Sequence, residues 1–454
     1  MSQSVRIIPL PLKGPKHART RRLLREGQIE AGRLWTDAVA WHRERRAAGG
    51  RWPDRNEIHA WSKGRYALHS QTVQRTVYRL LENVEATMTR RRNEPGTRRW
   101  LRLPWREKRF QPLVWPAQAP SYDPDRERLV LPMGRGRPSI VLTGIHLETV
   151  GAMSVVWNDG YELHVAVPDP APAARPEATG RVTIDLGEIH LGTAVSDTGR
   201  GLVVSGRGIR AKKRYRNKEL GRLARAQRRA TTGSRRWRRL QAAKNALKAR
   251  IRRQVRDLRH KATRQLIDFC VEVGAAELFI GDPRGVRRNR CGRKHNQRIS
   301  QWEMGTDLRY LEEKARKAGI RSFSGDERGT SSTCPGCGHR QKVRGRDWRC
   351  RSCGFTGHRD VVGAVNMFPL AFGTKVTFPR PQDVTYLQPG PVRRARRAVV
   401  AQDTGPATGN RRRRFTNLPD GPPSAETAKA VSSRGGRKPR VPDTVRHWEE
   451  TPHL

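Results

Sequence analysis

The spacing of apolar residues divides the first 170 residues into helical and extended regions. Residues 4–12 predict a single strand, and residues 17–49 then repeat apolar positions at helical intervals among many arginines. A second helical stripe runs from about residue 62 to residue 88. Residues 110–168 change to short alternating runs, which predict a small β-barrel or sandwich that the strand at 4–12 completes. The pattern therefore indicates a helical insertion within a β-domain.

Three more apolar runs follow within residues 182–210, in the order VTIDLG, GTAVSD and LVVSGRGI. Asp197, Thr198 and Gly199 form the predicted turn between the second and third runs. The first run contains one carboxylate, Asp185, which must be paired or bind a cation because an unpaired buried charge is costly. Ribonuclease-H-type nuclease domains begin with such a hairpin, although DxG on a strand also opens sugar-kinase and actin-like phosphate sites.

The next 120 residues predict helices followed by a strand-helix-strand unit. Two very basic helices are expected between residues 211 and 273, with Ser234 as the N-cap of the second. A buried strand at residues 276–282 ends in Asp282, and a helix ends at Gly319. The strand IRSFSGDE then carries Glu327. This order predicts the parallel crossover of a ribonuclease-H-type sheet.

The most specific signal is a pair of CxxC motifs. Cys334 and Cys337 form the first pair, and Cys350 and Cys353 form the second, which gives four thiolates for a tetrahedral zinc ion. No coordination position remains open, so the predicted zinc is structural. Cys270 and Cys291 are assigned no role. Directly after this ribbon, GHRDVVGAVNMF places Asp360 near the start of a helix.

The charge of the chain points to a polyanionic partner. Its 93 Lys and Arg residues against 42 acidic residues give a formal net charge of +51. Phosphate is the natural neutraliser of such a charge, and we expect the affinity to depend on salt. No apolar run approaches the length of a membrane span and no signal-peptide pattern is evident. These features predict an intracellular nucleic-acid-binding protein.

The motifs TSSTCPGCG, CRSCG and HRDVVGAVNM, in this order after Asp185, resemble the TnpB family of insertion-sequence proteins. They are similar also to the compact type V CRISPR effectors. The resemblance covers residues 4 to about 370, including ALHSQTVQRTVYRLLENVEA and LPWREKRFQPLVW. It implies a multidomain α/β protein that binds a guide RNA and cuts double-stranded target DNA, next to a short flanking motif, at one RuvC-like site in the prokaryotic cytoplasm.

The resemblance also implies a division of the chain. The expected parts are the first strand of a wedge β-barrel at 1–16, a helical recognition lobe at 17–105, the rest of the wedge and a linker at 106–178, a RuvC-like nuclease at 179–329 and 357–378, an inserted zinc ribbon at 330–356, and a basic disordered tail at 379–454.

Carried over residue by residue, the resemblance makes Asp185 the first catalytic acid and Asp360 the last. The family's usual middle glutamate is replaced by Gly281. Glu327, at the end of the next strand, is the preferred substitute, and Asp282 is the alternative. These acids would hold two magnesium ions for phosphodiester hydrolysis.

Other functions stay open at this point. The glycine at position 281 fits a nuclease-inactive RNA-guided repressor, and the source of the guide RNA separates a TnpB-type protein from a type V CRISPR effector. A strand-transfer transposase would carry its last acid without a ribbon before it, and a simple zinc-ribbon RNA-binding protein would not need Asp185.

Overall fold

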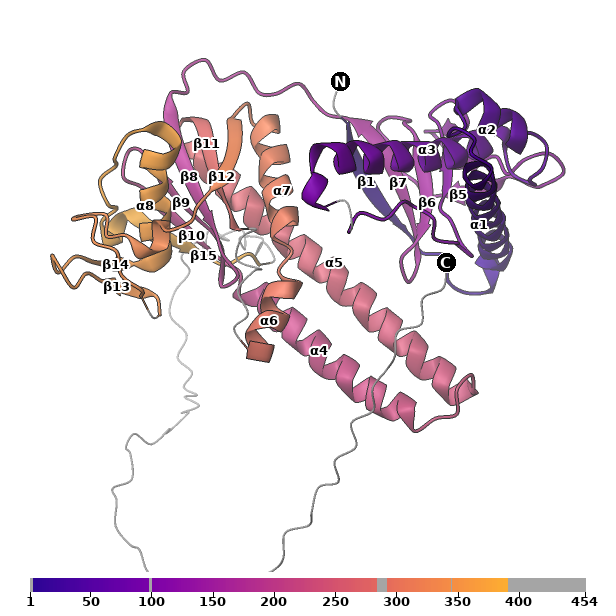
Figure 1. Ribbon diagram of the computed structural model, residues 1–454. Coiled ribbons are helices and arrows are strands. Elements are labelled where there is room, and N and C mark those ends of the chain that lie inside the picture. The colour runs from indigo at the N-terminus through magenta and orange to yellow at the C-terminus, as the bar shows by residue number, and fades with distance from the viewer. Residues whose placement is uncertain (1–2, 98–99, 284–291, 344, 391–454) are drawn as a thin grey trace, which may run out of the picture. The chain divides into compact units, whose positions relative to one another are not determined.

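The computed structural model describes residues 3–97, 100–283, 292–343 and 345–390. The predictions for Cys291 and for the tail beyond residue 390 concern residues outside these ranges. Figure 1 shows a lobe of strands and helices from the first 168 residues and a second lobe built on one mixed sheet.

The strands of the first lobe form two sheets, one with the order β1-β7-β6-β2 and one with the order β3-β4-β5. The expected completion by the first strand is confirmed, because β1 pairs antiparallel with β7 although the whole helical insertion separates them in sequence. The strands are β1 (Gln3–Leu10), β2 (Leu113–Trp115), β3 (Ser121–Asp123), β4 (Arg128–Leu131), β5 (Ile140–Thr143), β6 (Met153–Trp157) and β7 (Tyr161–Pro168).

Three helices interrupt this β-domain, namely α1 (Ala18–Ala47), α2 (Arg55–Ser62) and α3 (Ser70–Asn93). The sequence pattern predicted α1 and α3 but missed α2. This short helix begins with a capping box, in which Asp54 accepts from the backbone N–H of Glu57 and the Glu57 side chain accepts from the N–H of Asp54. Asp at the N-cap with Glu three residues later is a helix start that the sequence contains.

The helices and both sheets of the first lobe share one apolar core. Trp35 of α1, Leu80 of α3, Leu131 of β4 and Val155 of β6 are all fully buried in it. The helical stripes and the alternating strand residues predicted from the sequence thus meet in a single cluster.

The second lobe has a six-stranded sheet in the order β12-β11-β8-β9-β10-β15. Its strands are β8 (Gly180–Leu186), β9 (His190–Ser196), β10 (Gly201–Ser205), β11 (Ala275–Asp282), β12 (Arg321–Asp326) and β15 (Val384–Leu387). The strands β8, β9 and β10 form an antiparallel meander, and β11 and β12 continue parallel to β8. This is the strand order of a ribonuclease-H-type, RuvC-like sheet, as predicted.

Helices cover both faces of this sheet (Figure 1). The helices are α4 (Arg207–Arg228), α5 (Arg235–Glu272), α6 (Gly292–Gln301), α7 (Met304–Lys317) and α8 (Arg359–Phe372). On one face, Ile184 and Ile280 belong to a core with residues of α5 and α7. On the other face, Val195 and Val203 pack in a smaller core with Phe368 of α8. Ser234 caps α5 as expected, since its Oγ accepts from the N–H of Trp237 at 3.2 Å.

The ribbon is inserted between β12 and α8. It contains the hairpin of β13 (Asp347–Arg349) and β14 (Thr356–His358), preceded by the 3-10 turn η4 (Thr330–Ser332). A small core of the ribbon includes Trp348, which is 1% exposed, and Val362 of α8. The ribbon is therefore packed on the helix that carries Asp360.

Two expectations for the second lobe are wrong. The disordered tail does not start at 379, because Val384–Leu387 forms β15 and pairs parallel with β10. This VTYL segment is β-branched and aromatic, and backbone pairing at the sheet edge orders it despite its Pro- and Arg-rich surroundings. The single helix expected to end at Gly319 is divided into α6 and α7, with a break at Trp302 and Glu303.

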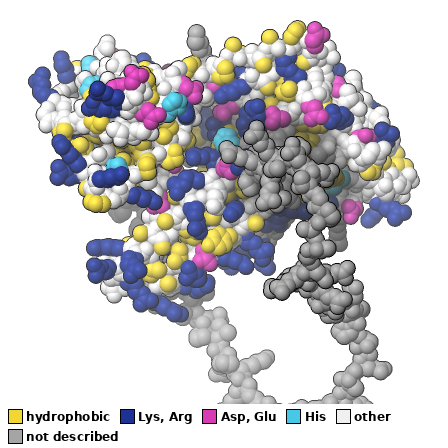
Figure 2. Space-filling view, turned by 180° about the vertical axis from the view of Figure 1, so that it is seen from behind, with side chains coloured by type: hydrophobic (Ala, Val, Ile, Leu, Met, Phe, Trp, Pro, Cys, Tyr) yellow, Lys and Arg dark blue, Asp and Glu magenta, His cyan; other side chains and the backbone are white. Residues whose placement is uncertain are grey.

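Basic side chains are spread widely over the surface, and Figure 2 shows many of them on one face. Helix α4 has only one acidic residue, Glu219. Among the described residues, the helices are either too short or too polar to cross a membrane.

Candidate active site

Three carboxylates converge at one end of the second-lobe sheet. Asp185 is the next-to-last residue of β8, Glu327 directly follows β12, and Asp360 is the second residue of α8. The strands β8, β11 and β12 are parallel, so their carboxyl ends lie at the same edge. The charges of Glu327 and Asp360 both act on Asp185, which places the three groups within one electrostatic cluster.

Glu327 occupies the space beside Gly281. A Cβ on Gly281 would lie 2.1 Å from Glu327 Oε2 and 2.7 Å from the Cε of Met367, so a side chain at this position would require Glu327 and Met367 to move. Glu327 Oε2 is buried and has no hydrogen-bond partner within the described chain. The Glu327 carboxylate, from the residue after β12, thus lies close to the position that a Cβ on β11 would take.

Asp282 is placed on the opposite side of the sheet. The register pairs Ile280 with Ile184, so Gly281 lies level with Asp185 and faces the same side, toward α8. Successive side chains of a strand alternate, and Asp282 therefore follows Ile280 toward the α5 and α7 layer. Its charge acts on Glu327 rather than on Asp185.

A glycine on α8 allows this helix to approach Asp185. A Cβ on Gly363 would lie 2.6 Å from Asp185 Oδ2. At the next residue, the backbone oxygen of Ala364 accepts from Thr183 Oγ1 at 2.7 Å, which fixes the helix against β8. The Asn366 side chain donates to the backbone oxygens of Thr330 and Thr333, both at 2.7 Å. Helix α8 therefore also holds the segment that follows Glu327.

The cluster favours an added cation. Burial and the charges of Glu327 and Asp360 raise the pKa of Asp185 well above its ordinary value. Burial, together with the charges of Asp282 and Asp326, raises the pKa of Glu327 to about 7. Carboxylates that resist ionisation because they face one another are stabilised when a cation lies between them.

Asp360 differs from the other two acids, because a histidine and an arginine already contact its carboxylate. Burial opposes its ionisation, but the hydrogen bond from His190 and the charge of Arg346 hold the pKa of Asp360 below its ordinary value. The His190 Nδ1 lies 2.7 Å from Asp360 Oδ2, and the Arg346 guanidinium contacts the same oxygen. No motif in the sequence indicated that His190 or Arg346 would contact Asp360.

The four ribbon cysteines are brought together as predicted. The Sγ atoms of Cys334 and Cys353 are 3.7 Å apart, and those of Cys337 and Cys350 are 3.6 Å apart. All four lie within 4.8 Å of one another. The thiolates of a tetrahedral zinc ion, each about 2.3 Å from the metal, are about 3.8 Å apart, so this cluster fits zinc. Cys270 is buried on α5, away from this set.

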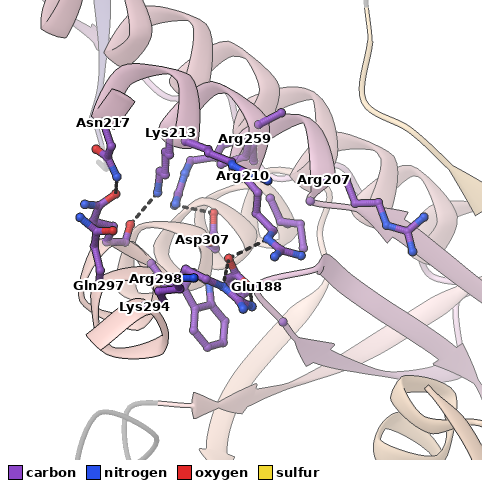
Figure 3. A pocket seen from close by; sticks show the side chains of 18 of the residues that line it. Glu188, Arg207, Arg210, Lys213, Asn217, Arg259, Lys294, Gln297, Arg298 and Asp307 are labelled. Carbon is purple, nitrogen blue, oxygen red and sulfur yellow. Dashed lines mark hydrogen bonds and ion pairs between the residues drawn. The ribbon is translucent and has the colours of Figure 1, made fainter. Parts of the chain in front are cut away.

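A cationic cavity of about 810 Å³ opens next to the turn that follows Asp185 (Figure 3). Its walls come from Gly187 and Glu188 after β8, from α4 and α5, and from α6 and α7. Glu188 forms ion pairs with Arg210, whose Nε lies 2.9 Å from Glu188 Oε1, and with Arg298. These ion pairs join α4 and α6 to the β8–β9 turn.

Deeper in the cavity, Arg259 donates to Asp307 Oδ1 at 2.8 Å, and both side chains are almost completely buried. Lys213 donates to Glu303 Oε2 at 2.9 Å. Other cations of the wall have no acidic partner in the part of the chain that the structure describes: Arg207, Arg214, Lys218 and Lys294. The cavity thus keeps an excess of positive charge suited to phosphate.

Comparisons with known families match the second lobe. Residues 162–287 match the family model described as probable transposase, OrfB_IS605, and residues 306–367 match the model described as Cas12f1-like, TNB domain. The first match includes Asp185, and the second includes Glu327, the four ribbon cysteines and Asp360. These matches confirm the resemblance to the TnpB family. A search of curated proteins found no match.

A search of solved structures found matches at low sequence identity. A Cas12f1 chain from a cryo-EM structure of a complex with sgRNA and target DNA has a TM-score of 0.54 and 12% identity, over 77% of this chain and 82% of that chain. CasPhi-2 (Cas12j) bound to crRNA has a TM-score of 0.41 and 11% identity, over 84% of this chain and 99% of that chain. The likeness to the Cas12f1 chain shows a common fold.

Proposed function

We propose that this protein is an RNA-guided DNA endonuclease of the TnpB type, which hydrolyses target DNA at a single RuvC-like site. One observation carries the proposal: Asp185, Glu327 and Asp360 converge at one edge of a ribonuclease-H-type sheet, with Glu327 in the space beside Gly281. The family matches over residues 162–287 and 306–367 support the same reading.

The side chains of Asp185, Glu327 and Asp360 would together hold two divalent ions. Two ions in such a site activate the attacking water and stabilise the leaving oxygen of the phosphodiester. The orphaned Glu327 Oε2 and the mutual repulsion of the acids fit this assignment. The protein's own part is to hold the acids on rigid elements, which Thr183 and Asn366 do through α8.

The ribbon would carry a structural zinc ion on its four thiolates. With zinc bound, these cysteines would fix the segment from Glu327 to Asp360, because the ribbon is inserted between these two residues. A distorted ribbon would misplace two of the three acids at once. Zinc binding here would therefore support the nuclease site without taking part in the reaction.

The partners would be a guide RNA and double-stranded target DNA. Pairing between guide and target would read the sequence, while basic side chains hold the backbone. The unpaired cations of the cavity in Figure 3 lie beside the turn after Asp185, and we assign them to the phosphates of the strand that reaches the acids. The prokaryotic cytoplasm, with association to the nucleoid, stays a prediction.

A nuclease-inactive RNA-guided repressor is the second candidate, because Gly281 leaves β11 without an acid on the α8 face. A compact type V CRISPR effector would use the same chemistry with a guide from another source. The position of Glu327 favours the active nuclease over the repressor.

The test is cleavage of a plasmid library that contains a fixed target next to randomised flanking DNA. The protein is purified with its co-purifying RNA and assayed with Mg²⁺, as wild type and as Asp185→Ala. We expect cleavage by the wild type beside one flanking motif and none by the variant. Target binding without cleavage by the wild type would replace the nuclease with the repressor.

A further inference from the structure

Two histidines adjoin Asp360 at the edge of the candidate active site. His190 is the first residue of β9, His358 is the last residue of β14, and Asp360 follows on the first turn of α8. One ligand atom from each of the three residues can be chosen so that all lie within 4.8 Å of one another. The two imidazole centroids are 5.2 Å apart.

The three side chains are held in place before any ion binds. His190 Nδ1 lies 2.7 Å from Asp360 Oδ2, and the two side chains are only 9% and 16% exposed. The backbone N–H of Arg359 donates to Arg346 O at 2.7 Å, which ties the start of α8 to the ribbon. The cluster therefore does not depend on a mobile surface side chain.

His358 has an unused ring nitrogen. Its Nδ1 is buried without a hydrogen-bond partner among the residues that the structure describes. A buried polar atom left in this way needs an explanation, and an absent ion is one of the few available. Glu327 Oε2, in the same cluster of acids, is another such atom, and the described residues contain further ones elsewhere in the fold.

Arg346 shows that this position attracts positive charge. Its guanidinium contacts the same Asp360 oxygen as His190, yet the Arg346 side chain is 31% exposed and can move aside. A guanidinium and a metal ion would compete for this oxygen. Removal of Arg346 should therefore strengthen ion binding.

Imidazole nitrogen changes which ion the site prefers. Mg²⁺ takes oxygen ligands and keeps its waters, whereas two imidazoles with one carboxylate suit divalent transition metals. A site made of carboxylates alone would bind Mg²⁺ and a transition-metal ion with similar affinity. Two histidines beside Asp360 shift this balance toward the transition ion.

We propose that His190, His358 and Asp360 bind a divalent first-row transition-metal ion. The ion would be one of the pair in the nuclease site, and only this consequence for cleavage rests on the proposed function. Binding itself can be measured without any cleavage. Mn²⁺ is a demanding probe because it is the weakest binder of the transition series.

The experiment titrates Mn²⁺ into the full-length protein, with the ribbon already loaded with zinc, and follows bound Mn²⁺ by electron paramagnetic resonance. Bound Mn²⁺ should show spin-echo modulation from ¹⁴N of imidazole, and a tenfold excess of Mg²⁺ should leave it bound. His190→Gln with His358→Gln should weaken binding about tenfold or more, and Arg346→Ala should strengthen it. His146→Gln, at an exposed histidine of the first lobe, is the matched control.

Wild-type protein whose bound Mn²⁺ has no ¹⁴N modulation would overturn the proposal even if the histidine variants fail to fold. Loss of Mn²⁺ to equimolar Mg²⁺ would do the same. Cleavage separates this proposal from the previous one. If Mn²⁺ binding depends on the histidines but no metal supports cleavage, the metal site is confirmed and the proposed nuclease activity is refuted. If Mg²⁺ supports cleavage but Mn²⁺ binding does not depend on the histidines, the nuclease is confirmed and the metal site is refuted.

Discussion

At the scale of single residues, the candidate site depends on two glycines that make room for carboxylates. Gly281 leaves space that the Glu327 side chain enters from the neighbouring strand, and Gly363 lets α8 approach Asp185. In the proposed site, the middle acid is therefore supplied by a different strand end. The relocation is possible because β11 and β12 are parallel and in register, with Gly281 opposite Gly325.

An exchange of the two positions tests this relocation. Gly281→Glu alone should place a second carboxylate against Glu327 and abolish cleavage. Gly281→Glu combined with Glu327→Ala should restore a measurable part of the activity, because the acid returns to the same space from β11. Single-turnover cleavage with protein of confirmed folding measures both. If the double variant is as inactive as Glu327→Ala alone, the two positions do not serve the same metal.

Sequence reasoning could find the acids at this scale but not their partners. Asp185, Glu327 and Asp360 stand in recognisable motifs on predicted strands and a predicted helix start. His190 contacts Asp360 across 170 residues of sequence, and no spacing rule connects the two positions. The orphaned Nδ1 of His358 is likewise visible only once β14 has been folded against the sheet.

At the scale of elements, the ribbon and α8 act as one support for the acids. Val362 of α8 belongs to the ribbon core, Asn366 binds the segment before the first cysteine pair, and Arg346 contacts Asp360. Both ends of the ribbon thus lead into the candidate site.

Loss of zinc should accordingly affect more than the ribbon. Cys337→Ser should lower the zinc content and the melting temperature, because metal binding contributes to folding free energy, and should reduce cleavage by roughly tenfold or more. Metal analysis, thermal unfolding and cleavage rates measure the three effects. Cys270→Ala, at the buried cysteine of α5, is the control and should keep its zinc. Unchanged cleavage by zinc-free protein would show that the ribbon does not position the acids.

Helix α2 offers a test of local stability in the first lobe. Asp54→Ala removes the acceptor for the N–H groups of Asn56 and Glu57, both at 2.9 Å, and should lower the free energy of unfolding of this lobe. Denaturant unfolding measures the loss. Asp54→Asn keeps a capping side chain and should lose much less. Equal losses in both variants would assign the effect to charge rather than to capping.

Long patterned elements were the predictable part of the fold. The longer strands of both lobes and the basic helices α4 and α5 show clear periodicity in the sequence. The structure contains these elements where the periodicity predicts them. Helix α2 has eight residues, too few for a convincing stripe, and β15 has four within a Pro- and Arg-rich segment. For such short elements tertiary pairing decides the conformation.

At the scale of the whole molecule, the formal charge of +51 requires a polyanion. The cavity of Figure 3 concentrates part of this charge next to the candidate active site. Sequence composition could predict the partner class but not the cavity, because its walls come from five separate segments.

The cavity predicts a local contribution to nucleic-acid affinity. Arg207→Ala and Lys218→Ala should each weaken binding at all sequences and lower the slope of log K against log salt by about 1. Filter binding across a salt series measures the slope. Lys261→Ala on α5 is the control, because Lys261 is already paired with Asp257 at 2.8 Å. Equal effects at Lys261 would mean that the cavity has no special role.

We propose that Glu327 supplies the middle acid of a RuvC-like nuclease. Single-turnover cleavage of a matched target in Mg²⁺, comparing Glu327→Ala with Asp282→Ala, tests this role. We expect Glu327→Ala to lose about 10³-fold in rate, as removal of several kcal/mol of transition-state stabilisation implies. Asp282→Ala should stay within about tenfold of the wild type. A larger loss of rate for Asp282→Ala than for Glu327→Ala would assign the metal ligand to Asp282 of β11 and contradict the proposed role of Glu327.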